Sequence, residues 1–211
     1  MDGFVLVLGT HNEKKKAELV QLLSPHGFAL KTLADFSNAL EVEETGITFA
    51  ENARLKAVEQ AKHLNHWVLG EDSGLSVDAL DGKPGVYSSR FAGESARDEQ
   101  NNEKLLTELG DLPLEKRTAF YTCHVCVSDS LGNVRFETEQ YCCGRILQER
   151  RGTAGFGYDP MFEIPEYKQT FGQLGDAVKS VLSHRAKAMR RLLPGLIRLA
   201  KNENWKAIEQ V

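Results

Sequence analysis

Two consecutive carboxylates, Glu71 and Asp72, stand where an apolar run ends, and Ser73 and Gly74 follow them directly. The run is typical of a β-strand, in which successive side chains point to opposite faces. We therefore expect Glu71 and Asp72 to point in opposite directions, so that one of them can face a binding site. A carboxylate at a strand end can bind a metal ion or accept a proton. Solvated acids at the end of a strand are the structural alternative.

A second polar segment, residues 10–15, follows the apolar run of residues 4–8 and opens a helical pattern. Asn12 is a suitable N-cap for that helix. Free N–H groups at a helix N-terminus favour an anion, and the ammonium group of Lys15 adds a full positive charge. The segment therefore predicts a phosphate contact, although a capped helix with a solvated lysine run is the alternative. It is not a P-loop, because the G-x-x-x-x-G-K-[ST] signature is absent.

An acidic loop precedes a helix that we expect over residues 48–64, whose first four residues form a capping box. The loop contains Glu41, Glu43 and Glu44, any of which could be a metal ligand. The same acids could instead be solvated and complement the helix dipole. Lys56 lies on this helix, away from the smooth side that its alanines form.

A glycine-rich loop at residues 152–160 carries Phe156, Gly157, Tyr158 and Asp159. Its glycine order differs from the dinucleotide-binding fingerprint, and a strand rather than a helix is expected after it. Three glycines with two aromatic residues suit a backbone that wraps closely around a flat ligand, with Phe156 or Tyr158 stacked on it. The alternative is a structural loop whose aromatic side chains pack inward.

Three further polar residues, Lys179, His184 and Arg185, precede a helix expected at about residues 186–200, which Pro194 should kink or interrupt. Lysine and arginine suit phosphate and carbonyl oxygens, whereas a solvated helix start is the alternative. Further strands are expected at residues 28–33, 118–127 and 134–143, a hairpin loop at 128–133, and a helix from about residue 95 to residue 110.

The cysteines Cys123 and Cys126 have the spacing of a zinc site, with His124 between them. This stretch is expected to be a strand, in which residues three apart face opposite sides. Structural zinc needs a turn to bring its ligands together, and no glycine or proline lies between these cysteines. We therefore expect buried, reduced thiols.

The composition limits the class of protein. The chain has 211 residues, of which 41% are hydrophobic and 27% charged, with a net charge of −4. These values fit one large or two-lobed globular domain and show no cationic footprint for nucleic acid or a membrane surface. The first residues lack the basic and long apolar regions of a signal peptide, so a cytoplasmic location is expected.

Acids suited to Mg²⁺, cations suited to phosphate and an aromatic loop suited to a base together favour phosphoryl-type chemistry on a nucleotide. Six motifs then show a resemblance over nearly the whole chain. They are Thr10-His11-Asn12-Glu13-Lys14-Lys15, Glu51-Asn52-Ala53-Arg54-Leu55-Lys56, Glu71-Asp72-Ser73-Gly74-Leu75, Gly82-Lys83-Pro84-Gly85-Val86-Tyr87-Ser88, Gly155-Phe156-Gly157-Tyr158-Asp159-Pro160 and Ser183-His184-Arg185-Ala186. With these motifs the chain resembles the inosine triphosphate pyrophosphatase family, in particular its bacterial RdgB/HAM1-like dITP/XTP pyrophosphatases.

The resemblance implies a single ITPase-like α/β domain over residues 1–211. That domain would have two lobes around a central cleft, a long curved mixed β-sheet flanked by helices, and a homodimeric assembly. It also implies Mg²⁺-dependent hydrolysis of nucleoside triphosphates between the α and β phosphates. The expected substrates are purines with a 6-keto group, namely ITP, dITP and XTP, and the products are the monophosphate and pyrophosphate.

Residue by residue, Asp72 matches the family's proton acceptor and Mg²⁺ ligand, and Lys56 matches a phosphate-side lysine. Glu44 is the best match for the second metal-side acid, although Glu41 or Glu43 could serve. The other matches are substrate contacts: Thr10, His11, Asn12, Glu13, Lys14 and Lys15 on the triphosphate, Ser73, the base-side loop Phe156, Gly157, Tyr158 and Asp159, and Lys179, His184 and Arg185 on base and phosphate. His11 departs from the small residue that many members carry there.

Three other functions fit the sequence less well. A Maf-like pyrophosphatase acting on modified pyrimidine nucleotides shares the general architecture, but its opening signature is absent, and Ser183-His184-Arg185 argues against it. A nucleotide-binding module without turnover is argued against by Asp72. The third alternative is an RNA-binding or structural protein, but this sequence lacks the basic face that RNA binding requires.

Overall fold

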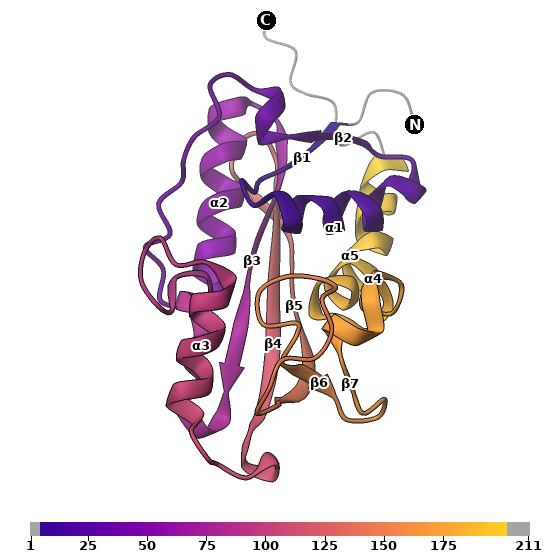
Figure 1. Cartoon of the computed structure of the whole chain (residues 1–211). Coiled ribbons are helices and arrows are strands. Elements are labelled where there is room, and N and C mark those ends of the chain that lie inside the picture. Colours follow the sequence, from indigo (N-terminus) through magenta and orange to yellow (C-terminus); the bar gives the residue numbers. More distant parts are fainter. Residues whose placement is uncertain (1–4, 202–211) are drawn as a thin grey trace, which may run out of the picture. The chain divides into compact units, whose positions relative to one another are not determined.

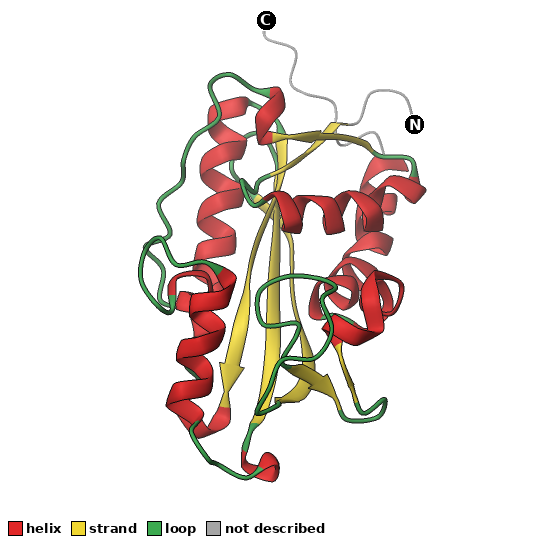
Figure 2. Ribbon diagram, viewed as in Figure 1, coloured by secondary structure: helices red, strands yellow, loops and turns green. Residues whose placement is uncertain are grey.

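A computed structural model describes residues 5–201, which form α-helices and β-strands joined by loops (Figures 1 and 2). The helices are α1 (Glu13–Leu23), α2 (Phe49–Leu64), α3 (Asp98–Leu109), α4 (Phe171–Leu182) and α5 (His184–Lys201). The strands are β1 (Val5–Leu8), β2 (Ala29–Thr32), β3 (Trp67–Val77), β4 (Thr118–Ser128), β5 (Val134–Ile146), β6 (Phe162–Ile164) and β7 (Gln169–Thr170).

The strands form a seven-stranded sheet in the order β2-β1-β3-β4-β5-β6-β7. Strand β1 pairs in parallel with β2 and β3, whereas β6 pairs antiparallel with β5 and β7. The sheet is therefore mixed, and helices flank it. The predicted α/β class is confirmed.

The chain divides into two compact units. Within the described residues, the first unit consists of residues 5–72, 123–140 and 187–201, and the second of residues 73–122 and 141–186. Strands β3, β4 and β5 contribute residues to both units. The single domain with a cleft between two lobes stays a prediction.

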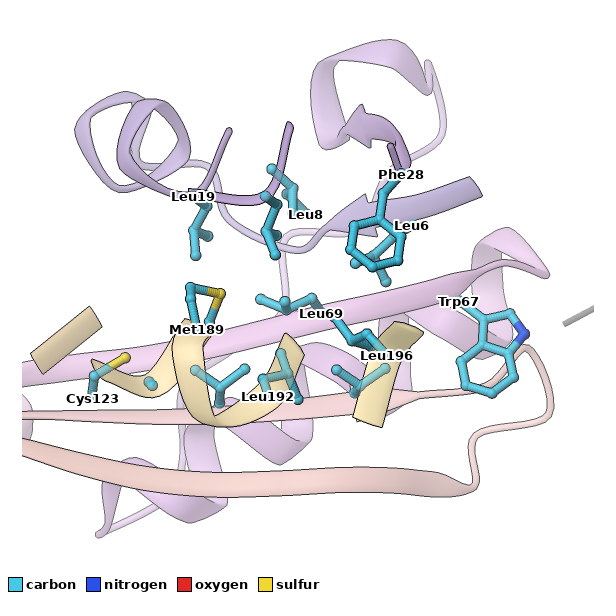
Figure 3. Close-up of a cluster of buried hydrophobic side chains, with 14 residues drawn as sticks. Leu6, Leu8, Leu19, Phe28, Trp67, Leu69, Cys123, Met189, Leu192 and Leu196 are labelled. Carbon is cyan, nitrogen blue, oxygen red and sulfur yellow. The ribbon is translucent and has the colours of Figure 1, made fainter. Parts of the chain in front are cut away.

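The core of the first unit shows why consecutive residues of β3 serve different faces. Leu6 of β1 and Leu69 of β3 are buried in a cluster with side chains of α1 and α5 (Figure 3). Val7 and Val68, their neighbours in sequence, belong to another buried cluster with side chains of α2. Strand alternation therefore places α1 and α5 on one face of these strands and α2 on the other.

Helix α2 approaches β3 closely at Gly70. A Cβ atom at Gly70 would lie 2.3 Å from Ala53 O and 2.6 Å from Ala57 N, so no larger residue fits there without a shift of the backbone. The two alanines are fully buried against Cys126 of β4. The small residues on both elements therefore set the distance between helix and strand just before Asp72.

The core of the second unit is built on the far half of β3. Leu75 and Val77 pack in a buried cluster with Leu105 and Leu109 of α3. Phe162 of β6 joins the same cluster, where its ring stacks against that of Phe171 at a centroid distance of 5.6 Å. This core supports α3 and the loop that precedes β6.

Most elements agree with the sequence patterns, within a few residues at their ends. Phe4, in the first expected strand, lies outside the described residues. Helix α4 was not predicted, and α5 runs through Pro194 instead of stopping there. Cys123 and Cys126 are buried in separate clusters, and neither forms a disulfide within the described residues, as expected for reduced thiols. Within residues 5–201, no helix is long and apolar enough to cross a membrane.

Candidate functional site

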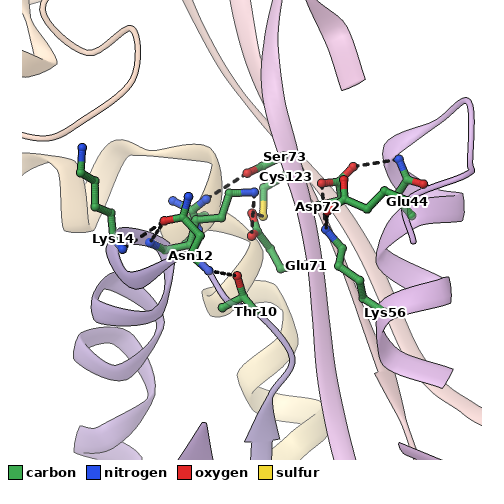
Figure 4. A network of polar contacts seen from close by, with 12 residues as sticks. Thr10, Asn12, Lys14, Glu44, Lys56, Glu71, Asp72, Ser73 and Cys123 are labelled. Atoms are coloured by element: carbon green, nitrogen blue, oxygen red, sulfur yellow. Dashed lines mark hydrogen bonds and ion pairs between the residues drawn. The ribbon is translucent and has the colours of Figure 1, made fainter. Parts of the chain in front are cut away.

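Asp72 and Glu44 converge on one lysine in the first unit. The ammonium nitrogen of Lys56 lies 3.0 Å from Asp72 Oδ1 and 3.2 Å from Glu44 Oε1 (Figure 4). The Lys56 side chain is 12% exposed and that of Asp72 only 7%. Lys56 belongs to α2, Asp72 to β3, and Glu44 to the loop before α2, so the close packing at Gly70 brings the three groups together.

Asn52 completes this cluster, although sequence reasoning assigned it no role. Its Nδ2 donates to Asp72 Oδ2 over 3.3 Å, and its Oδ1 accepts from the N–H of Gly46 over 2.8 Å. Asn52 and Lys56 are four residues apart on α2 and therefore share one face. The four-residue spacing from Lys56 is the feature of the sequence that could have pointed to Asn52. We call Glu44, Asn52, Lys56 and Asp72 the carboxylate–lysine cluster.

Burial and charge oppose each other in this cluster. Burial raises the pKa of the Asp72 carboxyl above its ordinary value, although the ammonium groups of Lys56 and Lys15 oppose the shift. Burial also acts to lower the pKa of Lys56, but the negative charges of Asp72 and Glu44 outweigh it, and the net pKa is raised. Lys56 is thus held as a cation, and Asp72 is a stronger proton acceptor than an exposed aspartate.

The donor set suits Mg²⁺ better than zinc. Among the residues that the structure describes, no three His, Cys, Asp or Glu side chains form a cluster able to hold a metal ion. Mg²⁺ usually takes one or two carboxylates and completes its octahedron with waters and substrate phosphates. Glu44 and Asp72 supply two carboxylates that already share one cation, so they fit such a site. Glu41 and Glu43 are exposed, whereas Glu44 is half-buried.

Glu71 faces away from Asp72, as strand alternation predicted. Its Oε2 lies 3.4 Å from the ammonium nitrogen of Lys15. Its Oε1 accepts a hydrogen bond from Cys123 Sγ over 3.4 Å (Figure 4). Glu71 is 1% exposed. The two consecutive acids therefore bind lysines from different helices, α1 and α2.

The segment at the start of α1 has the predicted cap. The Asn12 side chain accepts hydrogen bonds from the N–H groups of Lys14 and Lys15, each over 3.0 Å, and the Asn12 N–H donates to Thr10 Oγ1 over 3.2 Å. His11 Nε2 donates to Leu40 O over 3.1 Å, which ties this segment to the start of the acidic loop. Glu13 is exposed and pairs with Lys16. From this segment, Lys15 lies beside the carboxylate of Glu71.

In the second unit, Asp159 holds together several of the expected substrate contacts. Its Oδ2 accepts from Lys179 Nζ over 2.6 Å and from the N–H of Phe156 over 2.9 Å. Its Oδ1 accepts from the hydroxyl of Tyr121 over 3.4 Å. Asp159 is 1% exposed. It therefore positions Lys179 and the glycine-rich loop from within the protein.

Phe156 is the half-buried aromatic residue of that loop. Lys179 Nζ lies 4.1 Å from its ring centroid, and the guanidinium carbon of Arg185 lies 5.9 Å away. Tyr158 is buried instead, and its hydroxyl donates to Ser88 O over 2.8 Å. Between the two aromatic residues considered for stacking on a base, the geometry favours Phe156.

Ser73 and Arg185 meet beside this loop. Arg185 Nη2 donates to Ser73 Oγ over 2.9 Å, although the two residues are far apart in the sequence. The neighbouring His184 stacks on Tyr121, with ring centroids 4.7 Å apart and an angle of 10° between the ring planes. We call Ser73, Phe156, Asp159, Lys179 and Arg185 the base-side cluster. Ser73 directly follows Asp72 of the carboxylate–lysine cluster in the sequence.

Comparison with known proteins shows which family the chain resembles. A family model described as the Ham1 family matches residues 6–195. A dITP/XTP pyrophosphatase of Rhodopirellula baltica is 55% identical over 204 residues, which cover 97% of this chain and 98% of that protein. A dITP/XTP pyrophosphatase of Desulforamulus reducens is 46% identical over 194 residues, covering 92% and 96%.

Solved structures are similar over the same length. A HAM1 protein from Coxiella burnetii superposes with a TM-score of 0.84 at 35% identity, covering 93% of this chain and all of that one. The Ham1 protein of Staphylococcus aureus gives a TM-score of 0.80 at 35% identity, covering 93% and 99%. The family match over residues 6–195 spans parts of both units.

Proposed function

The chain belongs to the Ham1 family, and from this premise we propose that it hydrolyses the triphosphates of non-canonical purines, namely ITP, dITP and XTP. The products are the nucleoside monophosphate and pyrophosphate. The observation that carries this proposal is the convergence of Asp72 and Glu44 on Lys56. A buried acid beside a fixed cation and a second carboxylate is suited to activating water next to a phosphate.

Asp72 acts as the proton acceptor in this reaction. A water oxygen bonds to the α-phosphorus while its proton passes to the Asp72 carboxylate. The bond from that phosphorus to the bridging oxygen breaks, and pyrophosphate leaves with the electron pair. Asn52 holds the second Asp72 oxygen, so the carboxylate keeps one orientation. Lys56 and Lys15 add positive charge on the phosphate side.

Glu44 and Asp72 would hold the Mg²⁺ that the resemblance implies. When bound, the ion supplies charge neutralisation for the triphosphate and its leaving group. The chain's own contribution is to keep the two carboxylates close together, which Lys56 does through its contacts with both. The acidic loop is fixed for this purpose at Leu40, whose N–H and C=O bond the side chain of Gln60, and at Gly46, which bonds Asn52.

The base-side cluster selects the purine. Arg185 is 1% exposed and its guanidinium can only donate hydrogen bonds. A 6-keto oxygen accepts such a bond, whereas the 6-amino group of adenine presents another donor. A buried donor left without an acceptor costs about 1–3 kcal/mol, so ATP binds less well than ITP. Phe156 provides a flat surface for the base.

The alternatives are less well supported. A Maf-like enzyme for modified pyrimidines is not favoured, because the Ham1 family model matches residues 6–195 and the similar proteins carry the name dITP/XTP pyrophosphatase. A binding module without turnover would not need the buried Asp72. A cytoplasmic location is also part of the proposal. A homodimeric assembly enters it through the resemblance alone, and sedimentation of the purified chain tests that assembly.

The proposal is tested by product analysis with ITP and Mg²⁺, comparing the wild-type chain with Asp72→Asn. We expect pyrophosphate and IMP from the wild type, and a loss of about 100-fold or more in kcat for the variant, measured at a temperature at which its circular-dichroism spectrum shows that it is folded. Asp111→Asn, which removes the charge of an exposed aspartate, is the matched control. Release of orthophosphate, or full activity of a folded Asp72→Asn, would contradict the mechanism.

A further inference from the structure

Two side chains of helix α3 form hydrogen bonds with the backbone of one residue of the glycine-rich loop, Gly157. The N–H of Gly157 donates to Asp98 Oδ2 over 2.8 Å, and Asn102 Nδ2 donates to Gly157 O over 3.1 Å. Asp98 and Asn102 are four residues apart on α3, so their side chains lie on one face, one turn apart. Both backbone hydrogen-bonding groups of Gly157 are therefore held by the same helix.

Asn102 makes this contact at a cost. The residue is 3% exposed, and within the described part of the chain its Oδ1 is buried without a hydrogen-bond partner. A buried acceptor without a partner destabilises the folded state, and a leucine of similar size would remove that penalty. Stability alone therefore does not explain an asparagine here, whereas its bond to Gly157 does.

Gly157 directly follows Phe156, the aromatic residue of the base-side cluster. Gly157 has a φ angle of 62°, in the left-handed region. The residue before it is Phe156, whose ring centroid lies 4.1 Å from Lys179 Nζ. On the other side of Gly157, the Tyr158 hydroxyl is fixed by Ser88 O. Asp159 is held by its ion pair with Lys179. Gly157 is therefore the residue of this loop through which α3 can hold the Phe156 ring in place.

We propose that Asp98 and Asn102 are positioning residues for the purine base. They fix Phe156 beside Lys179 and Arg185 through the backbone of Gly157, and neither needs to touch the nucleotide. This inference rests on the proposed function, because it assigns the held ring to the base of the substrate. Its consequence is that the affinity for the base depends on two side chains of a helix that carries none of the reacting groups.

The test compares three variants in steady-state hydrolysis of ITP. Asn102→Leu and Asp98→Ala each remove one bond to Gly157, and we expect each to raise KM about tenfold while kcat changes less than about twofold. Asp98→Asn keeps an acceptor for the Gly157 N–H and should restore a KM close to that of the wild type. Thr107→Ala, whose hydroxyl bonds only Glu103 O on the same helix in the described structure, is the matched control.

Two readouts separate positioning from a structural role. Asn102→Leu should melt at or above the wild-type temperature while its KM rises, which a stabilising residue would not do. Amide hydrogen exchange should be faster in the peptide covering residues 153–161 in Asn102→Leu and Asp98→Ala, and unchanged in Thr107→Ala.

The two claims fail separately. If the wild-type chain turns over ITP and both variants keep the wild-type KM and loop exchange, only the positioning claim is overturned. If the wild-type chain does not release pyrophosphate from ITP, the proposed function is overturned, and the assignment of Phe156 to a base falls with it.

Discussion

In the first unit, the ammonium nitrogen of Lys56 lies 3.0 Å from Asp72 Oδ1; the Asp72 side chain is buried and that of Lys56 is 12% exposed. In a buried setting each charge depends on the other, because removing one partner leaves the other desolvated and unpaired. Lys56 also contacts Glu44, so this one cation offsets two carboxylates.

Replacing this cation tests its role. We expect Lys56→Met to lower kcat/KM for ITP about 100-fold, since a fixed positive charge on the phosphate side is lost. The variant should also be stabilised by Mg²⁺ more than the wild type, because Asp72 and Glu44 then lack an internal counter-ion. Pyrophosphate release and thermal melting with and without Mg²⁺ measure the two effects. Pyrophosphate release by Lys56→Met at the wild-type rate would show that Lys56 has no role in the reaction.

The close approach of α2 to β3 should matter for activity as well as stability. Gly70→Ala places a Cβ 2.3 Å from Ala53 O, so we expect a loss of about 1–3 kcal/mol in the free energy of unfolding and a marked fall in kcat. Gly27→Ala is the control, because its φ of 77° costs a similar strain at the end of the segment that follows α1. Equal losses of kcat in both variants would show a general stability effect.

The choice among the three loop acids can be measured through the metal. Chelation of Mg²⁺ should abolish pyrophosphate release, and Mg²⁺ should restore it. Glu44→Gln should raise the Mg²⁺ concentration for half-maximal activity at least about tenfold, because one of two carboxylate ligands is lost. Glu43→Gln, at an exposed position, should leave it unchanged. The opposite result would move the metal ligand to Glu43.

Base selection should depend on Arg185. We expect Arg185→Ala to narrow the ratio of kcat/KM for ITP over ATP by about 10–100-fold, since the donor that disfavours a 6-amino group is gone. Arg191→Ala removes an exposed arginine of the same helix and is the control. An unchanged ratio in folded Arg185→Ala would place selection on another residue.

Asp129 provides a pH-dependent test of the hairpin that joins β4 and β5. Burial acts to raise its pKa, but hydrogen bonds from Asn133, Arg135 and Leu131 outweigh this and hold it below the ordinary value of 3.8. A lowered folded-state pKa contributes stability above pH 3.8, and this contribution is lost as the pH falls through the folded-state pKa.

We therefore expect Asp129→Asn to lower the free energy of unfolding by about 1 kcal/mol at pH 7, and the difference to shrink below pH 3.8. Denaturant titrations at pH 7 and below pH 3.8 measure this difference in the free energy of unfolding, with Asp111→Asn as the control. A difference that grows in acid would contradict the assigned direction of the shift.

Local patterns predicted the parts of the site that depend on neighbouring residues. Strand alternation separated Glu71 from Asp72, and cap chemistry identified Asn12 and the start of α2 at Thr48. These signals need only the periodicity of one element and the free N–H groups at its end. The same periodicity placed Cys123 and Cys126 on opposite faces.

Long-range contacts could not be predicted in this way. The bond from Asn102 to Gly157 spans 55 positions, and no local pattern links an amide on a helix to a distant loop. Helix α4 was missed because glycines interrupt its pattern, and Gly175 adopts φ 75° and ψ 177° within it. The ion pair of Asp159 with Lys179 likewise depends on tertiary packing, so the sequence identified both residues without showing that one holds the other.

The most direct test of the central claim is the initial rate of pyrophosphate release from ITP, XTP and ATP, measured in parallel with Mg²⁺. The account predicts rapid release from ITP and XTP and a rate about 10–100-fold lower from ATP. Equal rates on the three nucleotides would contradict the selection by Arg185. No release from ITP or XTP by the folded chain would contradict the proposed function itself.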